Sequence, residues 1–89
     1  MIQETITISN KLGLHARASA KLTKLAGGFT CDVWMTRNER RINAKSIMGV
    51  MMLAAGMGAT VQIETDGVDE REAMDGLLAL INDKFGEGE

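Results

Sequence analysis

The sequence predicts an α+β fold: an open-faced two-layer sandwich, in which a four-stranded antiparallel sheet carries three helices on one face. Three observations support this class. Segments with strand periodicity and segments with helix periodicity alternate in the order β-α-β-β-α-β-α. The last segment has a continuous apolar stripe at helical spacing. Hydrophobic residues make up 45% of the chain but aromatic residues only 3%, so the core has to be aliphatic.

The first half of the chain contains two predicted strands with a helix between them. Isoleucines that alternate with polar residues predict a half-buried strand over residues 2–8. Apolar residues at helical spacing predict a helix over residues 16–26, which ends at two consecutive glycines. Strict alternation returns over residues 29–36 and predicts a second strand, with Cys31 on its inner face and Trp34 on its outer face.

The middle of the chain continues with a hairpin and a short helix. A turn over residues 37–40 leads into a predicted third strand over residues 41–44. Ser46 precedes an apolar run over residues 47–55, which predicts a helix with Ser46 as its N-cap. A fourth strand is predicted over residues 59–65, where apolar and polar residues alternate again.

The C-terminal helix is the clearest helical pattern. Asp69 and Glu72 are spaced as in a capping box, with Asp in place of the usual Ser or Thr, and predict that the helix begins there. Its apolar stripe consists of Met74, Leu77, Leu78, Ile81 and Phe85.

Length and composition predict one domain, residues 1–89, in the cytoplasm. Cys31 is the only cysteine, so no internal disulfide forms, and the chain has no cysteine and histidine set for a metal. We expect no cofactor. The first residues lack the features of a signal peptide, and no apolar run is long enough for membrane insertion. The small size, without an obvious symmetric apolar face, predicts a monomer.

Charge is distributed unevenly along the chain, although the net charge is only −2. Residues 1–50 carry eight Lys and Arg against three Asp and Glu, whereas residues 51–89 carry two against nine. A basic surface formed by the first half would attract acidic protein partners. Nucleic acid is a weaker candidate, because the chain is acidic overall and its basic residues lack interleaved aromatics.

The only histidine, His15, stands immediately before the first predicted helix. The first N–H groups of a helix lack intrahelical partners and lie at its positive end, so the backbone of Ala16 and Arg17 would bind a phosphate on His15. The Arg17 guanidinium adds a planar clamp for the same oxygens. The helix dipole disfavours a charged imidazolium and so favours a neutral, nucleophilic ring. This pattern predicts a group that accepts phosphoryl and gives it away again, whereas the plain structural alternative is a surface histidine.

Two further groups of residues are candidates for partner docking. Lys21 and Lys24 form a basic stripe on the first helix, and Lys45 precedes the second. The second predicted helix has more large apolar side chains than one short helix needs to bury, namely Ile47, Met48, Met51 and Met52. Methionine side chains are flexible and suit a surface that accepts several partners. The alternative, that all four face the sheet, remains open from the sequence.

Two motifs resemble the HPr family, the histidine-containing phosphocarriers of the bacterial phosphoenolpyruvate-dependent phosphotransferase system. They are Gly13-Leu14-His15-Ala16-Arg17 and the segment from Asn43 to Met51, and the resemblance extends over essentially the whole chain. It implies that enzyme I phosphorylates Nδ1 of His15, that Arg17 assists, and that IIA proteins or domains accept the phosphoryl group. Many members have proline where this chain has Ala18, which leaves the branch open between sugar-type HPr and its nitrogen-related paralogue.

The resemblance also implies a regulatory site, because Ser46 matches the serine that HPr kinase/phosphorylase modifies in some bacteria. Added charge there would repel acidic partners and inhibit docking. Three other functions compete with the carrier. They are a ferredoxin-like binding module, a phosphoserine-dependent regulatory homologue and, least favoured, an acylphosphatase-like hydrolase.

Overall fold

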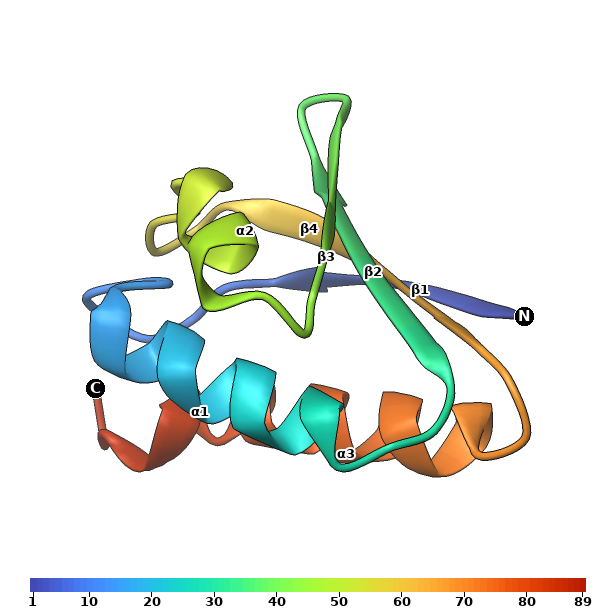
Figure 1. The fold of residues 1–89 in the computed structure, drawn as a ribbon. Coiled ribbons are helices and arrows are strands. Elements are labelled where there is room, and N and C mark those ends of the chain that lie inside the picture. Colours follow the sequence, from blue (N-terminus) through green and yellow to red (C-terminus); the bar gives the residue numbers. More distant parts are fainter.

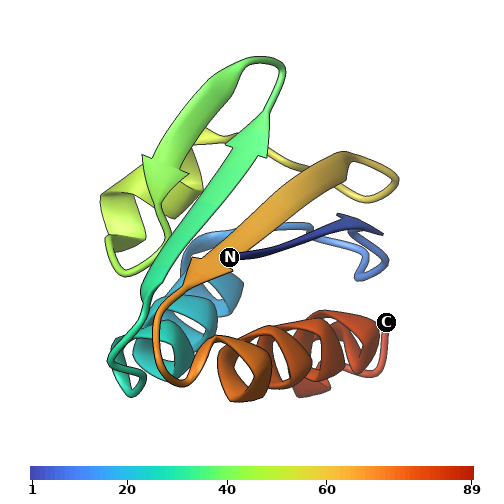
Figure 2. The same cartoon turned by 90° about the vertical axis from the view of Figure 1, so that its right-hand side faces the viewer.

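The computed structural model describes residues 1–89 and contains one four-stranded sheet. The strands are β1 (Ile2–Thr7), β2 (Asp32–Arg37), β3 (Arg40–Asn43) and β4 (Thr60–Asp66). Their order across the sheet is β1-β4-β2-β3, and every neighbouring pair is antiparallel. The sheet therefore places the first and last strands side by side, as Figure 2 shows.

The helices are α1 (Ala16–Gly27), α2 (Ile47–Met52) and α3 (Glu70–Asn82), and a short 3₁₀ turn, η1 (Lys84–Gly86), follows α3. In Figure 1, α1 and α3 lie side by side beneath the sheet, and α2 packs against α1 and β3. The predicted open-faced sandwich is confirmed. None of these helices is both long enough and apolar enough to cross a membrane.

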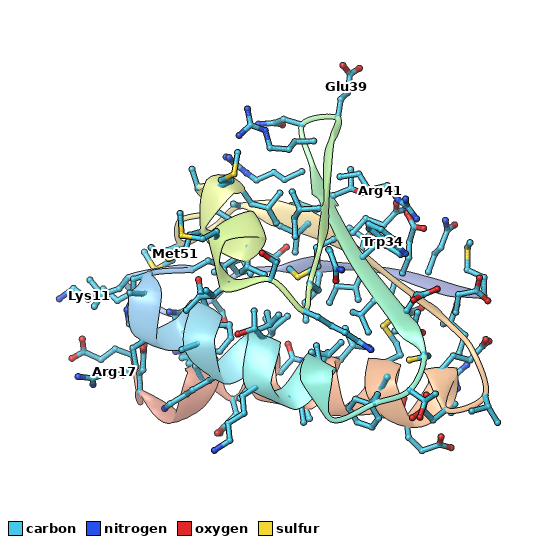
Figure 3. All side chains as sticks on the ribbon, viewed as in Figure 1. Lys11, Arg17, Trp34, Glu39, Arg41 and Met51 are labelled. Carbon is cyan, nitrogen blue, oxygen red and sulfur yellow. The ribbon has the colours of Figure 1, made fainter.

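One apolar core lies between the sheet and the helices. It contains 19 buried residues, of which Phe85 is the only aromatic one. Val33 and Met35 of β2 and Val61 and Ile63 of β4 point into it, because alternate residues of a strand face the same side. Trp34 lies on the opposite face as predicted, where the Arg41 guanidinium stacks 4.2 Å from the centre of its ring (Figure 3).

Two predicted element boundaries were wrong by three residues, whereas those of α1, β1, β3 and β4 differ by at most one. β2 begins at Asp32, so Phe29 and Cys31 lie in the loop before it rather than in the strand. α2 ends at Met52 instead of residue 55, because Ala54 has a positive φ of 50°. The residues after α2 pair elsewhere: the carbonyl oxygen of Ala55 accepts the backbone N–H of Leu14 at 2.8 Å.

α3 begins directly after Asp69 as predicted, but the predicted capping box there was wrong. The Asp69 side chain caps no helix; instead, its carboxylate accepts the backbone N–H groups of Thr30 and Cys31, both at 2.8 Å. These bonds, that of Thr30 first, lower the pKa of Asp69. The carboxylate thus accepts two backbone N–H groups of the loop between α1 and β2. These tertiary hydrogen bonds take the place of a side-chain cap on α3.

Phe85 lies beyond the end of α3, contrary to the prediction that it continues the helical stripe. Its φ is 56°, and its side chain is completely buried. The carbonyl oxygen of Phe85 accepts a hydrogen bond from Nζ of Lys21 in α1 at 2.6 Å. The C-terminal residues are thereby held against α1, and the C-terminus lies near the first turn of this helix (Figure 1).

Candidate functional site

His15 is the N-cap of α1, as the sequence predicts. Its backbone is extended, with φ −72° and ψ 178°, and its carbonyl oxygen accepts the N–H of Ser19 at 2.8 Å. Its side chain makes no cap hydrogen bond. The buried Ser19 also donates its hydroxyl to the carbonyl oxygen of Leu14 at 3.0 Å. The backbone of His15 is thus held from both sides, while the ring remains available for chemistry.

Gly13 allows the chain to approach the loop after α2. Its φ is +66°, and a Cβ built there would lie 2.5 Å from the carbonyl oxygen of Ala55 and 2.6 Å from Cα of Gly56. The neighbouring Leu14 donates its N–H to that same carbonyl oxygen. A residue without a side chain is therefore required two positions before His15.

The His15 ring contacts a carboxylate from the other end of the chain. Nε2 of His15 lies 2.5 Å from Oε2 of Glu87, and the two side chains are 26% and 15% exposed. Oε1 of Glu87 accepts a hydrogen bond from Nδ2 of the fully buried Asn10 at 3.0 Å. The bond from Asn10, followed by that from His15, lowers the pKa of Glu87. Glu87 is thus an ionised hydrogen-bond acceptor.

His15 lines a depression of about 680 Å³ that is open to solvent. Its charged lining is mixed, because three basic side chains face it together with two glutamates. The lining residues are Lys11, Leu12, His15, Ala16, Arg17, Lys21, Gly86, Glu87 and Glu89.

The depression has the donors that an anion needs. The backbone N–H groups of Ala16 and Arg17 have no acceptor within the protein, and the exposed Arg17 side chain makes no ion pair. Figure 3 shows Arg17 and Lys11 projecting outward at the same end of the molecule. Lys21 is the exception, since its ammonium group already donates to Phe85. Residues 15–17 therefore provide a nucleophile and an anion-binding group together.

The predicted docking residues divide between two locations. Lys24 is exposed on α1, whereas Nζ of Lys45 donates to the carbonyl oxygen of Phe29 at 2.8 Å, in the loop that follows α1. The four predicted docking residues of α2 are exposed, whereas Val50 of the same helix is buried. Figure 3 shows Met51 at the end of the molecule that carries Lys11. The exposed fractions of the four are 40% for Ile47, 66% for Met48, 39% for Met51 and 55% for Met52.

Ser46 caps α2 as predicted. Its Oγ accepts the backbone N–H of Gly49 at 3.2 Å, and the residue is exposed. The hydroxyl hydrogen has no acceptor within the protein, so the group is accessible from solvent.

Glu87 and Asn10 were not found by reasoning from the sequence. Glu87 is 72 residues from His15 along the chain, and Asn10 lies outside every predicted helix and strand. No spacing rule links such distant residues. The only signal in the sequence was the concentration of carboxylates toward the C-terminal end, which does not indicate which of them contacts His15.

Comparisons with known proteins give a consistent result. Residues 2–83 match the family model described as PTS HPr component phosphorylation site. Phosphocarrier protein HPr from Cupriavidus necator is 71% identical over 89 residues, which cover both chains completely. Phosphocarrier protein NPr from Shewanella violacea is 41% identical over 86 residues, covering 97% of this chain and 94% of the relative. The crystal structure of HPr-C-His from Thermoanaerobacter tengcongensis matches with a TM-score of 0.95 at 44% identity, and the match covers 98% of each chain. The crystal structure of an HPr dimer from the same organism matches with a TM-score of 0.79 and covers 98% of this chain and 100% of the other.

Proposed function

The chain belongs to the HPr family of phosphocarrier proteins of the phosphotransferase system, and from this premise we propose that it accepts phosphoryl from phosphorylated enzyme I on His15 and passes it to IIA proteins or domains. One observation carries the proposal. The ring of His15 stands at the N-terminus of α1, with Nε2 occupied by Glu87, beside the unpaired N–H groups of Ala16 and Arg17. The protein is a carrier that is itself phosphorylated and dephosphorylated, rather than an enzyme acting on a small substrate.

The chemistry of transfer follows from these groups. The Nδ1 lone pair of His15 attacks phosphorus in line with the bond to the donor histidine, and a P–N bond forms as the donor's breaks. The N–H groups of Ala16 and Arg17 and the Arg17 guanidinium stabilise the charge on the equatorial oxygens. The depression is open to solvent, so in this proposal the next acceptor reaches phosphorus without a lid having to move. A carrier requires such moderate binding, because a phosphate held too firmly would not be released.

Docking takes place, in this proposal, on the surface that adjoins the depression. The exposed side chains Ile47, Met48, Met51 and Met52 supply apolar area, and Arg17, Lys21 and Lys24 supply positive charge. This combination suits acidic partners with an apolar centre, whose encounter the charge accelerates. Lys45 is less suited to direct contact, because its ammonium group is already bonded to Phe29.

Phosphorylation of Ser46 by HPr kinase/phosphorylase is the proposed regulation. The hydroxyl is exposed at the start of α2, directly before the apolar docking residues. A phosphate there can accept the Gly49 N–H in place of Oγ, so the fold is retained, while the added charge repels acidic partners. Normal transfer kinetics from enzyme I to a fully Ser46-phosphorylated sample would contradict this regulation.

The branch, location and oligomeric state complete the proposal. The family match argues against the ferredoxin-like binding module and the hydrolase. The intact His15 favours a carrier over a purely regulatory homologue. Both HPr and NPr proteins are among the relatives, so the sugar and nitrogen branches are distinguished by which IIA protein accepts phosphoryl. We place the protein in the cytoplasm as a monomer, and sedimentation at working concentration tests the monomer against a dimer like that of the T. tengcongensis protein.

The first experiment is phosphorylation in a defined mixture. The chain is incubated with enzyme I, Mg²⁺ and phosphoenolpyruvate, and its intact mass is measured before and after acid treatment, with His15→Ala as the control. We expect one acid-labile phosphate that is missing from the control. No phosphate on the wild-type chain, with an enzyme I that phosphorylates another HPr, would refute the carrier function.

A further inference from the structure

Glu87 is the residue whose side chain bonds to the His15 ring, and it lies outside α1 and the loop that precedes it. It lies beyond residues 2–83, the part of the chain that the family model matches. Three contacts hold the segment that carries it: Lys21 Nζ donates to the carbonyl oxygen of Phe85, the N–H of Lys11 donates to the carbonyl oxygen of Glu89, and the Phe85 ring is buried in the core. The position of Glu87 is therefore set by the fold, not by the flexibility of a chain end.

The partners of Glu87 determine where the proton of the His15 ring lies. Asn10 must present its Nδ2 to both of its neighbours, because the Gly13 carbonyl and the Glu87 carboxylate only accept hydrogen bonds. Its Oδ1 is left buried without a hydrogen-bond partner. The opposite orientation of the amide would place Oδ1 against the two acceptors, so it is disfavoured. Glu87 is ionised, so the short contact with His15 requires a proton on Nε2. The neutral ring then has its lone pair on Nδ1.

We propose that Glu87 is a positioning residue for phosphoryl transfer: its carboxylate, oriented by Asn10, holds the proton of His15 on Nε2 and so presents Nδ1 as the nucleophile. This inference rests on the proposed carrier function. It adds a carboxylate–histidine pair that orients the ring, in the way that buried carboxylates orient catalytic or metal-binding histidines elsewhere.

The proton remains on Nε2 through both transfers. When phosphoryl arrives, the Nδ1 lone pair forms the P–N bond, the donor nitrogen recovers the electron pair of its own P–N bond, and the ring becomes positively charged with Nε2–H still bonded to Glu87. When phosphoryl leaves, the P–N electrons return to Nδ1, and the leaving group is the neutral imidazole. No proton has to move, and the nearby carboxylate offsets the charge that develops on the ring.

The charged groups around the ring come from three parts of the chain. Arg17 and Lys21 belong to α1, Lys11 to the preceding loop, and Glu89 to the same C-terminal segment as Glu87. Glu89 is 72% exposed and pairs only with Lys11, at 3.8 Å. It is the matched control, because it has the same side chain and lies in the same segment but makes no contact with His15.

The test compares Glu87→Ala with Glu89→Ala. His15 is the only histidine, so ring ¹H–¹⁵N spectra of the labelled protein are unambiguous. In the wild-type chain and in Glu89→Ala we expect the proton on Nε2 and slow exchange with water. In Glu87→Ala we expect exchange that is faster by about tenfold or more, because a charge-assisted hydrogen bond is lost. We expect kcat for transfer from enzyme I to fall about tenfold in Glu87→Ala, with KM for the carrier changed little.

The outcomes separate the two proposals, because the spectra need no enzyme I. Equal Nε2 exchange and equal kcat in the two alanine variants would overturn the role of Glu87, even if the chain is a carrier. If the wild-type chain accepts no phosphate, the carrier function fails, and the spectra still decide whether Glu87 holds the proton. If Glu87→Ala does not fold, Glu87→Gln replaces it. Glutamine has one acceptor oxygen for two donors and no charge, so we expect changes in the same direction.

Discussion

Replacing Gly13 by alanine tests whether close approach of two loops positions His15. Gly13 is buried, has a φ of +66°, and leaves 2.5 Å between a built Cβ and the carbonyl oxygen of Ala55. Gly58 is the matched control, because its φ is +89° and a Cβ there meets nothing within 4 Å. Both substitutions force an L residue into left-handed backbone, but only Gly13→Ala also creates a clash.

The expected cost of each substitution follows from these contacts. The left-handed backbone costs about 1–2 kcal/mol for a residue with a Cβ, and the less flexible unfolded chain returns about 0.4–1 kcal/mol, so Gly58→Ala should destabilise by about 1 kcal/mol. At Gly13 the Cβ must also move from 2.5 Å to about the 3.4 Å of an ordinary contact, against backbone atoms. This displacement breaks the bond between the Leu14 N–H and Ala55, and with the associated repacking it adds about 2 kcal/mol.

Thermal denaturation and phosphoryl transfer together measure the effect. For a domain of this size, about 2 kcal/mol corresponds to a melting temperature lower by about 8–16 °C in Gly13→Ala than in Gly58→Ala. Because Leu14 and His15 move with the loop, transfer from enzyme I should slow by at least about tenfold in Gly13→Ala and remain near wild type in Gly58→Ala. Equal melting temperatures and equal rates for the two variants would show that the contact with Ala55 does not position His15.

Three further predictions concern caps and buried groups. Ser46→Ala should lower the free energy of unfolding by about 1 kcal/mol in urea titrations, because the Gly49 N–H loses its acceptor; an unchanged midpoint would contradict this. The pKa of Asp69 is lowered in the folded state, so its contribution is complete above the ordinary carboxyl pKa and is lost as pH falls through the lowered value. The stability difference between wild type and Asp69→Asn should therefore disappear in acid, and a difference independent of pH would refute the assignment. Cys31 is 2% exposed, and burial, followed by its bond to Asp69, raises its pKa, so a thiol reagent should react no faster than the chain unfolds.

The elements that the sequence predicted well are those whose signal is local. α1 begins directly after His15 as expected, since helix periodicity and two terminal glycines lie within one short segment. β4 follows its alternation to within one residue at each end. The predictions that failed depend on distant partners. α2 ends early where Ala55 bonds to Leu14, and the Asp69 side chain bonds to the loop at Thr30 instead of capping α3, although α3 does begin directly after Asp69.

The candidate site divides in the same way. His15, Ala16 and Arg17 are neighbours in the sequence, so a helix start alone places a nucleophile, two N–H donors and a cation together. The sequence did not decide whether the α2 methionines are exposed. Helical spacing does not indicate how many apolar side chains the space between the helix and the sheet can hold, and only the packing shows this.

The sequence by itself determined the order of the elements, the aliphatic core and the place of the His15 imidazole at the start of α1, because each depends on residues within a few positions of one another. Only the tertiary structure decided which nitrogen of His15 faces a carboxylate. That choice depends on Asn10 and Glu87, which are 77 residues apart and meet because the buried Phe85 returns the chain to α1. Local preferences are set by neighbours in the chain, whereas the contact between Asn10 and Glu87 exists only once the core has formed.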